Sequence, residues 1–214
     1  RELAKAMNGL QRLQSLELSC ETIEGEAINW NFPELEYADL RGTSISDNAV
    51  SEICNQCPNI QRLYLDSTCI SSDSLCYIVQ LEQIEILSLN NTNISGGLHH
   101  LNSLSNLSYL YLQNTKVDDD SIKELRDARQ LKQIQLSNTE ITNDGVEGLA
   151  NIPTLGSLML YNTNIDEGVY ESFKRMPNLV SLYLSSSCGM SRSDMQELYD
   201  QGVLIIEIDP NAYV

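Results

Sequence analysis

A repeat with a period of about 24 residues runs through the chain. It consists of leucine-x-leucine pairs, and the steps between the second residues of successive pairs are 22, 25, 24, 23, 24, 24, 24 and 24. These anchor positions are Leu18, Leu40, Leu65, Leu89, Leu112, Leu136, Leu160, Leu184 and Ile208. A period this regular predicts a solenoid, in which each unit packs mainly against its two neighbours.

Each unit reads L-x-x-L-x-L-x-x-T-x-I, as in "LKQIQLSNTEI" at 131–141. The alternating leucines predict a short strand with one buried face, because successive strand side chains point to opposite faces. Acids and hydroxyls follow, and then an apolar spacing such as Val146 and Leu149. These residues suit the N-cap and first turn of a short helix, and Pro153 closes the unit. Every unit is therefore expected to pair one strand of a parallel sheet with one short outer helix.

These units resemble the leucine-rich repeat family, in its variant of about 24 residues with Thr where many members carry Asn or Cys. The resemblance covers nearly the whole chain. It implies an α/β fold, a right-handed, horseshoe-shaped solenoid with a parallel sheet on the concave face and short helices on the convex face. We expect inward-turned hydroxyls to satisfy backbone groups where each strand bends away. The positions concerned are Thr43, Thr68, Thr92, Thr115, Thr139, Thr163 and Ser187.

We expect one leucine-rich repeat domain over 1–214, with about eight to nine repeats. Residues 1–32 are predicted to form an irregular N-terminal cap, because Glu21 interrupts the threonine column and Trp30 and Phe32 would cover the core. An aromatic ligand site at Trp30 is the alternative interpretation. Residues 203–214 are predicted to form a C-terminal closing strand.

The composition excludes several classes of partner. Thirteen basic residues against 30 acidic ones give a formal charge of −17, which opposes binding to the phosphates of nucleic acids or anionic membranes. The apolar runs are far shorter than the roughly 20 residues that span a bilayer, so we expect no membrane insertion. The six cysteines are not needed as a disulfide framework in so long and apolar a chain. Reduced thiols favour an intracellular location over secretion. We expect a monomer, and the sequence also suits one part of a larger multidomain chain.

If Leu110 and Leu112 point into the core, the residues three before, one before and one after each anchor point to the concave face. Over all units, these positions form three columns of concave residues. Six of the ten tyrosines fall in these columns. From Ile86 to Ser185 the fifteen concave positions contain no charged residue, although 20% of the chain is charged. Depletion of charge together with Tyr and Met is typical of interface centres. The alternative explanation is that strands generally favour Tyr and disfavour charge.

We therefore predict a non-catalytic module that recognises a protein or peptide partner on a tyrosine-rich, uncharged concave face. The resemblance implies the same kind of ligand. The predicted partner-binding residues are Tyr37, Arg62, Tyr64, Tyr109, Tyr111, Gln113, Met159, Tyr161 and Tyr183. The alternative is a secreted or cell-surface receptor for a glycan or an extracellular protein, because a neutral polar and aromatic surface also suits sugars.

The cysteines do not form a recognisable chemical motif. Cys54 and Cys57 are spaced C-x-x-C, but no second pair follows at zinc spacing, and both fall on core positions of the repeat. We expect them to be buried. Cys69 and Cys188 share a variable slot of the unit, which predicts exposure and leaves open that either is a reactive thiol.

The chain's histidines and acidic runs also point away from catalysis. His99 and His100 are the only histidines, and adjacent residues diverge on a helix instead of chelating together. The "DDD" run at 118–120 lacks the glycine and distal glutamate of a calcium loop and suits a helix start. We predict no catalytic residues, no metal site and no cofactor.

Overall fold

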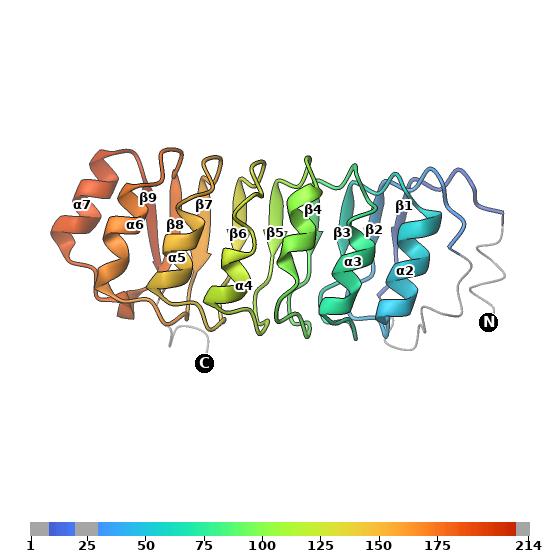
Figure 1. Ribbon diagram of the computed structural model, residues 1–214, viewed down its shortest axis with the longest axis horizontal. Coiled ribbons are helices and arrows are strands. Elements are labelled where there is room, and N and C mark those ends of the chain that lie inside the picture. Colours follow the sequence, from blue (N-terminus) through green and yellow to red (C-terminus); the bar gives the residue numbers. More distant parts are fainter. Residues whose placement is uncertain (1–8, 20–29, 209–214) are drawn as a thin grey trace.

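The computed structural model describes residues 9–19 and 30–208. Nine strands form one parallel sheet within these ranges, and each strand pairs with the next along the chain (Figure 1). The strands are β1 (Ser15–Glu17), β2 (Tyr37–Asp39), β3 (Arg62–Tyr64), β4 (Ile86–Ser88), β5 (Tyr109–Tyr111), β6 (Gln133–Gln135), β7 (Ser157–Leu160), β8 (Ser181–Ser185) and β9 (Leu204–Ile208).

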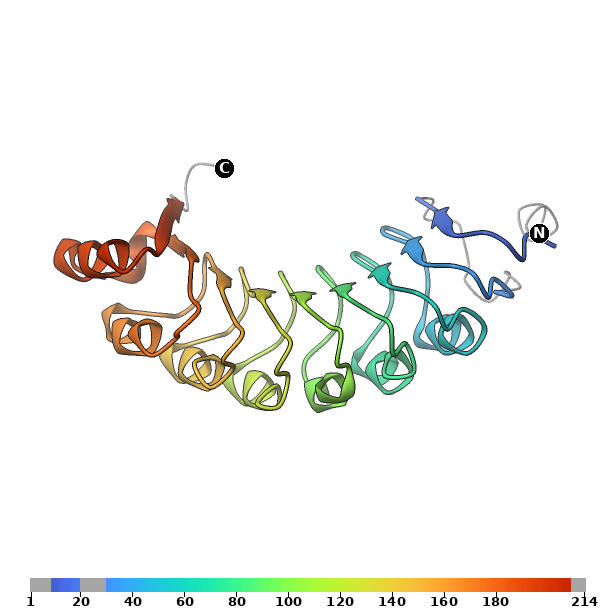
Figure 2. The ribbon, with the colours of Figure 1, turned by 90° about the horizontal axis from the view of Figure 1, so that it is seen from above.

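The molecule is an open arc. Figure 2 shows the strands along the inner curve and the helices along the outer curve. The helical segments, with η for 3-10 helix, are α2 (Asp47–Gln56), η2 (Ser72–Ser74), α3 (Leu75–Ile78), η3 (Leu98–Ser103), α4 (Asp119–Lys123), α5 (Asn143–Leu149), η4 (Glu167–Val169), α6 (Tyr170–Lys174), η5 (Ser186–Cys188) and α7 (Arg192–Asp200). The fold class predicted from the repeat is confirmed.

A continuous apolar core lies between the sheet and the helices. In β5, Leu110 is fully buried while Tyr109 and Tyr111 on either side are half-buried, and most strands repeat this alternation. The register aligns the buried middle residues into one column that includes Leu87, Leu110 and Ile134. Each unit therefore buries its leucines against those of its neighbours, and a fully buried Leu or Ile contributes about 1.5 to 3 kcal/mol.

The threonine column has the predicted role. Thr115 Oγ1 donates a hydrogen bond to the carbonyl oxygen of Leu112 at 2.6 Å, and the threonine is buried. Five further threonines make the same bond to the leucine three residues earlier, at 2.5 to 2.8 Å. The hydroxyl thus satisfies a carbonyl where the strand ends and the chain turns.

A left-handed residue precedes the threonine in six of the units; it is Gly42 in one unit and a residue other than glycine in the five described next. The φ angle at these five positions lies between 51° and 57°, a conformation that Asn tolerates better than most residues. The residues are Ser67, Asn91, Asn114, Asn138 and Asn162. Two pairs of these asparagines also link neighbouring units, because Asn114 Nδ2 donates to Asn91 Oδ1 at 2.6 Å and Asn162 Nδ2 donates to Asn138 Oδ1 at 2.8 Å.

Trp30 and Phe32 are core residues. Each side chain is only 1% exposed, and their rings meet edge to face with centroids 6.4 Å apart. The Cys57 thiol donates to the Trp30 carbonyl at 3.0 Å. An aromatic ligand site at Trp30 is therefore wrong, because the ring is inaccessible. The predicted cap over 1–32 includes 1–8 and 20–29, which lie outside the described residues, so the cap as a unit stays a prediction.

The register of the last strand differs from the expected one. Ser185 pairs with Ile208, and Leu184 therefore pairs with Glu207 instead of Ile208. The buried Val203 directly precedes Leu204, and Leu204 pairs with Ser181. The repeat places one further residue between the buried position and the start of the strand, and this residue is missing here. Sequence periodicity did not reveal this slip. Of the predicted closing strand over 203–214, Leu204–Ile208 is a strand, and 209–214 lie outside the described residues.

The turn after β8 also departs from the repeat. The 3-10 helix η5 follows the strand directly, and Gly189 after it has a φ angle of 76°. Cys188 is 2% exposed and Ser187 is exposed, so the cysteine takes the buried place that the repeat assigned to the serine. The predicted exposure of Cys188 is wrong, because the inserted turn moves the chain by one position.

Candidate functional site on the concave sheet face

Two rows of side chains cross the concave sheet face. Neighbours in a row sit on adjacent strands, about 4.8 Å apart. The first row is Ser15, Tyr37, Arg62, Ile86, Tyr109, Gln133, Ser157, Ser181 and Leu204. The second row is Glu17, Asp39, Tyr64, Ser88, Tyr111, Gln135, Met159, Tyr183 and Ile206.

Two tyrosine and arginine pairs interlock on β2 and β3. The Arg62 guanidinium lies over the Tyr37 ring, 5.7 Å from its centroid. The Arg41 guanidinium lies over the Tyr64 ring at 5.4 Å, and the two tyrosine rings are themselves 5.6 Å apart. With the carboxylate of Asp39, these four side chains make up what we call the N-terminal cluster.

The charge of Arg41 is neutralised within the N-terminal cluster. Asp39 is buried, and its Oδ1 accepts hydrogen bonds from Arg41 Nε at 2.8 Å and from the Arg41 backbone N–H at 3.2 Å. These bonds lower the pKa of Asp39 and raise that of Arg41. The pKa of Tyr37 is raised, mainly by burial and then by the nearby charge of Asp39.

Asp66 anchors a chain of polar groups along the strand ends. It is 8% exposed, and its Oδ1 accepts hydrogen bonds from Ser88 Oγ at 2.7 Å and from the backbone N–H of Asn90 at 3.1 Å. Asn90 Oδ1 in turn accepts the backbone N–H of Gln113 at 2.7 Å. The carboxylate of Asp66 and the amide of Asn90 thus accept backbone N–H groups that a neighbouring backbone carbonyl would accept if the strands were longer. They stabilise the end of the sheet in this way.

Tyr109 and Tyr111 project from β5 and are half-buried. The pKa of Tyr111 is raised, first by burial and then by its proximity to Tyr64 and Tyr109. Only the small side chain of Ser88 lies between Tyr64 and Tyr111 in the second row. The tyrosines of the N-terminal cluster and of β5 therefore form one aromatic surface over β2 to β5.

Gln113 belongs to a short series of amides and hydroxyls beside that surface. Gln135 Nε2 donates to Gln113 Oε1 at 3.4 Å, and Ser137 Oγ donates to Gln135 Oε1 at 2.7 Å. The side chain of Gln113 is thereby oriented by its neighbour while it stays half-exposed. It offers amide donors and acceptors next to Tyr111.

The remaining predicted residues form a second group on β7 and β8. Met159 pairs directly with Tyr183, and Gln133 Nε2 lies 4.0 Å from Met159 Sδ. Tyr161 follows β7 and is half-buried. The nine predicted residues thus share one face, but the glutamines of β6 separate this group from Tyr109 and Tyr111.

Sequence reasoning did not select Arg41 or Asp66 as site residues. The structure brings Arg41 onto Tyr64 and buries Asp66 beneath the polar chain. The sequence contained an indication of the N-terminal cluster. Asp39 and Tyr64 occupy equivalent positions of neighbouring units and lie opposite each other in the register, and Arg41 follows Asp39 by two residues.

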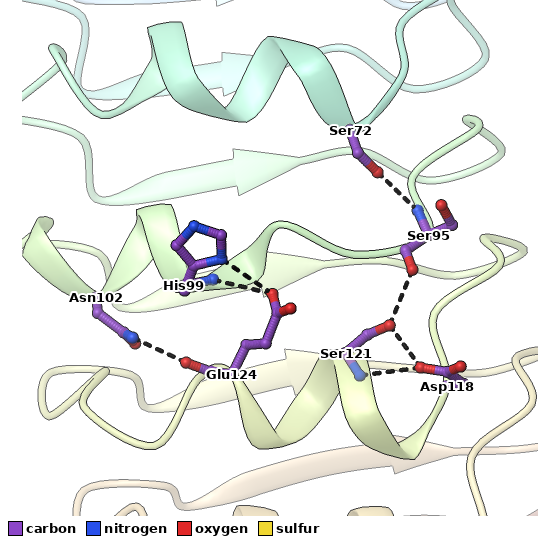
Figure 3. Close-up of polar contacts among 7 residues, drawn as sticks. All are labelled: Ser72, Ser95, His99, Asn102, Asp118, Ser121 and Glu124. Atoms are coloured by element: carbon purple, nitrogen blue, oxygen red, sulfur yellow. Dashed lines mark hydrogen bonds and ion pairs between the residues drawn. The ribbon is translucent and has the colours of Figure 1, made fainter.

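His99 and His100 lie in η3 on the convex side, opposite the face that carries the concave tyrosines. His99 is exposed, and Glu124 Oε2 is 3.4 Å from its Nδ1 and accepts its backbone N–H at 3.2 Å. Asn102 Nδ2 donates to the Glu124 carbonyl at 2.8 Å, so this contact ties η3 to the next unit (Figure 3). Across 9–19 and 30–208, no three His, Cys, Asp or Glu side chains gather as a metal site would require.

The acidic run at 118–120 starts α4, as predicted. Asp118 Oδ1 caps the helix by accepting the Ser121 backbone N–H at 2.9 Å and its hydroxyl at 2.6 Å (Figure 3). Asp119 reaches the next unit, where its two oxygens accept the backbone N–H and the hydroxyl of Thr142 at 2.8 and 2.6 Å. Asp120 pairs with Lys123 at 3.6 Å on the surface. Of these three acids, Asp119 links neighbouring units on the convex side.

In the part of the chain that the structure describes, no helix has both the length and the apolar character needed to cross a bilayer.

Comparison with known proteins gives similarity in structure only. No protein-family model matches the sequence, and no curated protein sequence matches it either. Internalin C2 of Listeria monocytogenes is 21% identical with a TM-score of 0.69, over 91% of this chain and 80% of internalin C2.

Two further structures are similar over most of this chain. They are the internalin InlF of the same bacterium, 19% identical with a TM-score of 0.68 over 96% of this chain and 63% of InlF, and a chain of the yeast Rad7 and Elc1 complex, 19% identical with a TM-score of 0.73 over 95% of this chain and 57% of that chain. The protein therefore spans less than two thirds of the length of these last two chains. The repeat, the parallel sheet and these similarities together show that the chain has the leucine-rich repeat fold.

Proposed function

We propose that this protein is a non-catalytic recognition module that binds a protein or peptide partner on its concave sheet face. One observation carries the proposal. Both concave rows are free of charge from β4 to β8, in a chain whose formal charge is −17, and half-exposed tyrosines stand in them. A partner that covers these strands would leave no unpaired charge buried there, which favours binding.

The geometry of the tyrosines supports the proposal. The rings of Tyr37 and Tyr64 lie 5.6 Å apart and Tyr111 is half-buried, so these side chains have less conformational entropy to lose on binding than fully exposed tyrosines. Tyrosine also supplies a large contact area and a hydroxyl that adapts to polar groups. The similar chain of the yeast Rad7 and Elc1 structure was solved in a complex with another protein, which favours a protein as the partner here.

The test compares the concave face with an exposed tyrosine elsewhere. The variant Tyr109→Ala, Tyr111→Ala, Tyr183→Ala should lose the partner that the wild-type chain captures from a native lysate. Removal of a tyrosine at a binding hot spot costs about 2 kcal/mol or more, or roughly 30-fold in affinity, although not additively. Tyr199→Ala is the matched control, because Tyr199 is 64% exposed on α7.

Circular dichroism must show that both variants keep the fold. If the captured partner binds the triple variant with unchanged affinity, the concave site is wrong. The alternative, a secreted or surface receptor for a glycan, is tested on the same proteins with a glycan array. The oriented amides of Gln113 and Gln135 favour this possibility, and glycan binding that requires Tyr109 and Tyr111 would support it over a protein partner.

A further inference from the structure

We propose that Arg62 is the anion anchor of the concave face. It would bind the carboxylate of an Asp or Glu side chain in an extended segment of the partner, while an apolar side chain two residues away rests on Ile86 and Tyr109. This inference rests on the proposed function and assigns a chemistry to the partner.

The first support is the balance of charges over β2 and β3. The cation of Arg41 is taken by Asp39, through side-chain bonds from Nε and Nη2. Asp66 is buried, holds internal donors through Oδ1 and lies in the field of Arg41. Arg62 is exposed, and none of the ion pairs among the described residues includes it. It is the cation of this face that a partner can still neutralise.

The second support is the geometry of Arg62. Its guanidinium lies over the Tyr37 ring, 5.7 Å from the ring centroid, and Tyr37 sits directly opposite on β2. A guanidinium held over a ring in this way keeps N–H groups available for a carboxylate. Because the side chain is already ordered, a bidentate bond to a carboxylate loses less conformational entropy than it would with a free arginine.

The charge of the site favours a carboxylate over a phosphate. One unpaired guanidinium matches one negative charge, whereas a phosphoryl group carries about −1.5 to −2 at neutral pH. The remaining charge would have to be placed beside Asp39 and Asp66, on a chain with a formal charge of −17. A carboxylate carries a single negative charge and therefore meets less repulsion from these two acids.

The spacing along the first row defines the neighbouring group. Ile86 and Tyr109 follow Arg62 on the next two strands, at about 4.8 and roughly 9.6 Å. An extended peptide that runs along this row presents every second side chain to the sheet, about 6.6 Å apart. A residue two positions from the acid therefore arrives between Ile86 and Tyr109, where an aliphatic or aromatic side chain would be buried.

A random peptide library selected on the immobilised wild-type chain tests this inference. Selected peptides should be enriched in an acidic residue two positions from an apolar one. Synthetic versions are then titrated by fluorescence polarisation. Arg62→Gln should weaken them about tenfold or more, as expected for a lost charged hydrogen bond. Arg129→Gln is the matched control, because this arginine is also exposed but lies outside the concave rows, and it should change nothing.

A double-mutant cycle gives the sharpest result. Changing the acid of the peptide to its amide should weaken binding to the wild-type chain as much as Arg62→Gln does, and should weaken binding to Arg62→Gln no further. Selected peptides that need Tyr109 and Tyr111 but tolerate Arg62→Gln would overturn the anchor and leave the proposed function intact. Peptides indifferent to those tyrosines would count against the concave site itself. Tighter, Arg62-dependent binding of phosphorylated peptides would overturn the choice of a carboxylate.

Discussion

The carboxylate of Asp39 accepts both the backbone N–H and the side-chain Nε–H of Arg41, two residues further along. This local pair sets the direction of the Arg41 side chain, and the guanidinium consequently lies over Tyr64 on the next strand. A buried carboxylate thus connects the end of β2 to the aromatic surface of β3.

The first prediction concerns the effect of pH on this pair. The hydrogen bond from Arg41 lowers the pKa of Asp39 below its usual 3.8, so the pair stabilises the fold above that value. The stabilisation is lost as the pH falls from about 4 through the lowered folded-state pKa. Asp39→Asn should therefore reduce the free energy of unfolding at neutral pH by about 2 kcal/mol and flatten its decline in acid. Urea unfolding at a series of pH values measures both effects.

Asp120→Asn is the control for this experiment, because the Asp120 side chain is 93% exposed. Its unfolding curves should follow those of the wild-type chain at every pH. A variant Asp39→Asn with the wild-type decline in acid would show that the pair with Arg41 does not contribute to acid sensitivity.

The second prediction concerns the threonine column. Thr115→Val keeps the shape of the side chain but removes the donor to the Leu112 carbonyl, which is then left without this partner. An unsatisfied buried carbonyl costs about 1 to 3 kcal/mol, so the midpoint of urea unfolding should fall. Thr115→Ser retains the hydroxyl and should recover most of the loss. Equal midpoints for the Val and Ser variants would contradict the role of the hydroxyl.

The repeating framework of strands and turns was predictable from the sequence, because the same physical requirement selects the same residue type at each of its positions in every unit. Leu110 and Leu112 must be buried, and Thr115 must satisfy a carbonyl, so these residue types repeat at a fixed spacing. The concave positions followed directly, since strand alternation fixes which side chains point away from the core.

Two kinds of feature were not predictable from the period. The contacts within the N-terminal cluster depend on side-chain directions, and these follow from register and local hydrogen bonds such as the one between Asp39 and Arg41. The shift in register at β9 depends on the turn before this strand, and no further repeat packs against β9 among the described residues. The period of 24 residues therefore placed the strand's anchor one residue too late. Cys188 was misplaced by a different turn, the 3-10 helix η5 that follows β8.

The third prediction concerns the close approach of Asp119 and Gly145 on the convex side. A Cβ at residue 145 would collide with Asp119 Oδ1, which accepts the backbone N–H of Thr142. Gly145→Ala should therefore destabilise the fold, although alanine in a helix is normally favoured over glycine by about 1 kcal/mol. Adding Asp119→Ala should remove the clash, so that the second substitution costs less in the Gly145→Ala background than alone. Thermal unfolding of the four proteins measures this coupling.

Gly148→Ala serves as the matched control on the same helix. The added Cβ would come within 3.2 Å of Lys123 Cγ, which belongs to a flexible side chain able to move. This variant should be at least as stable as the wild-type chain because of the helix propensity of alanine. If Gly145→Ala were as stable as Gly148→Ala, the contact with Asp119 would not constrain the helix.

The fourth prediction concerns thiol reactivity. Burial raises the pKa of Cys54 to about 12 and that of Cys57 to about 11, so almost no thiolate is present at pH 8. Cys69 and Cys76 are exposed, whereas Cys188 is buried. Iodoacetamide should therefore modify Cys69 and Cys76 in the native chain, and the buried Cys54, Cys57 and Cys188 only after denaturation, as peptide mass spectrometry will show. Native labelling of Cys54 at the rate of Cys69 would contradict a structural role for the C-x-x-C pair, since a packed thiol in the core can neither ionise nor meet the reagent.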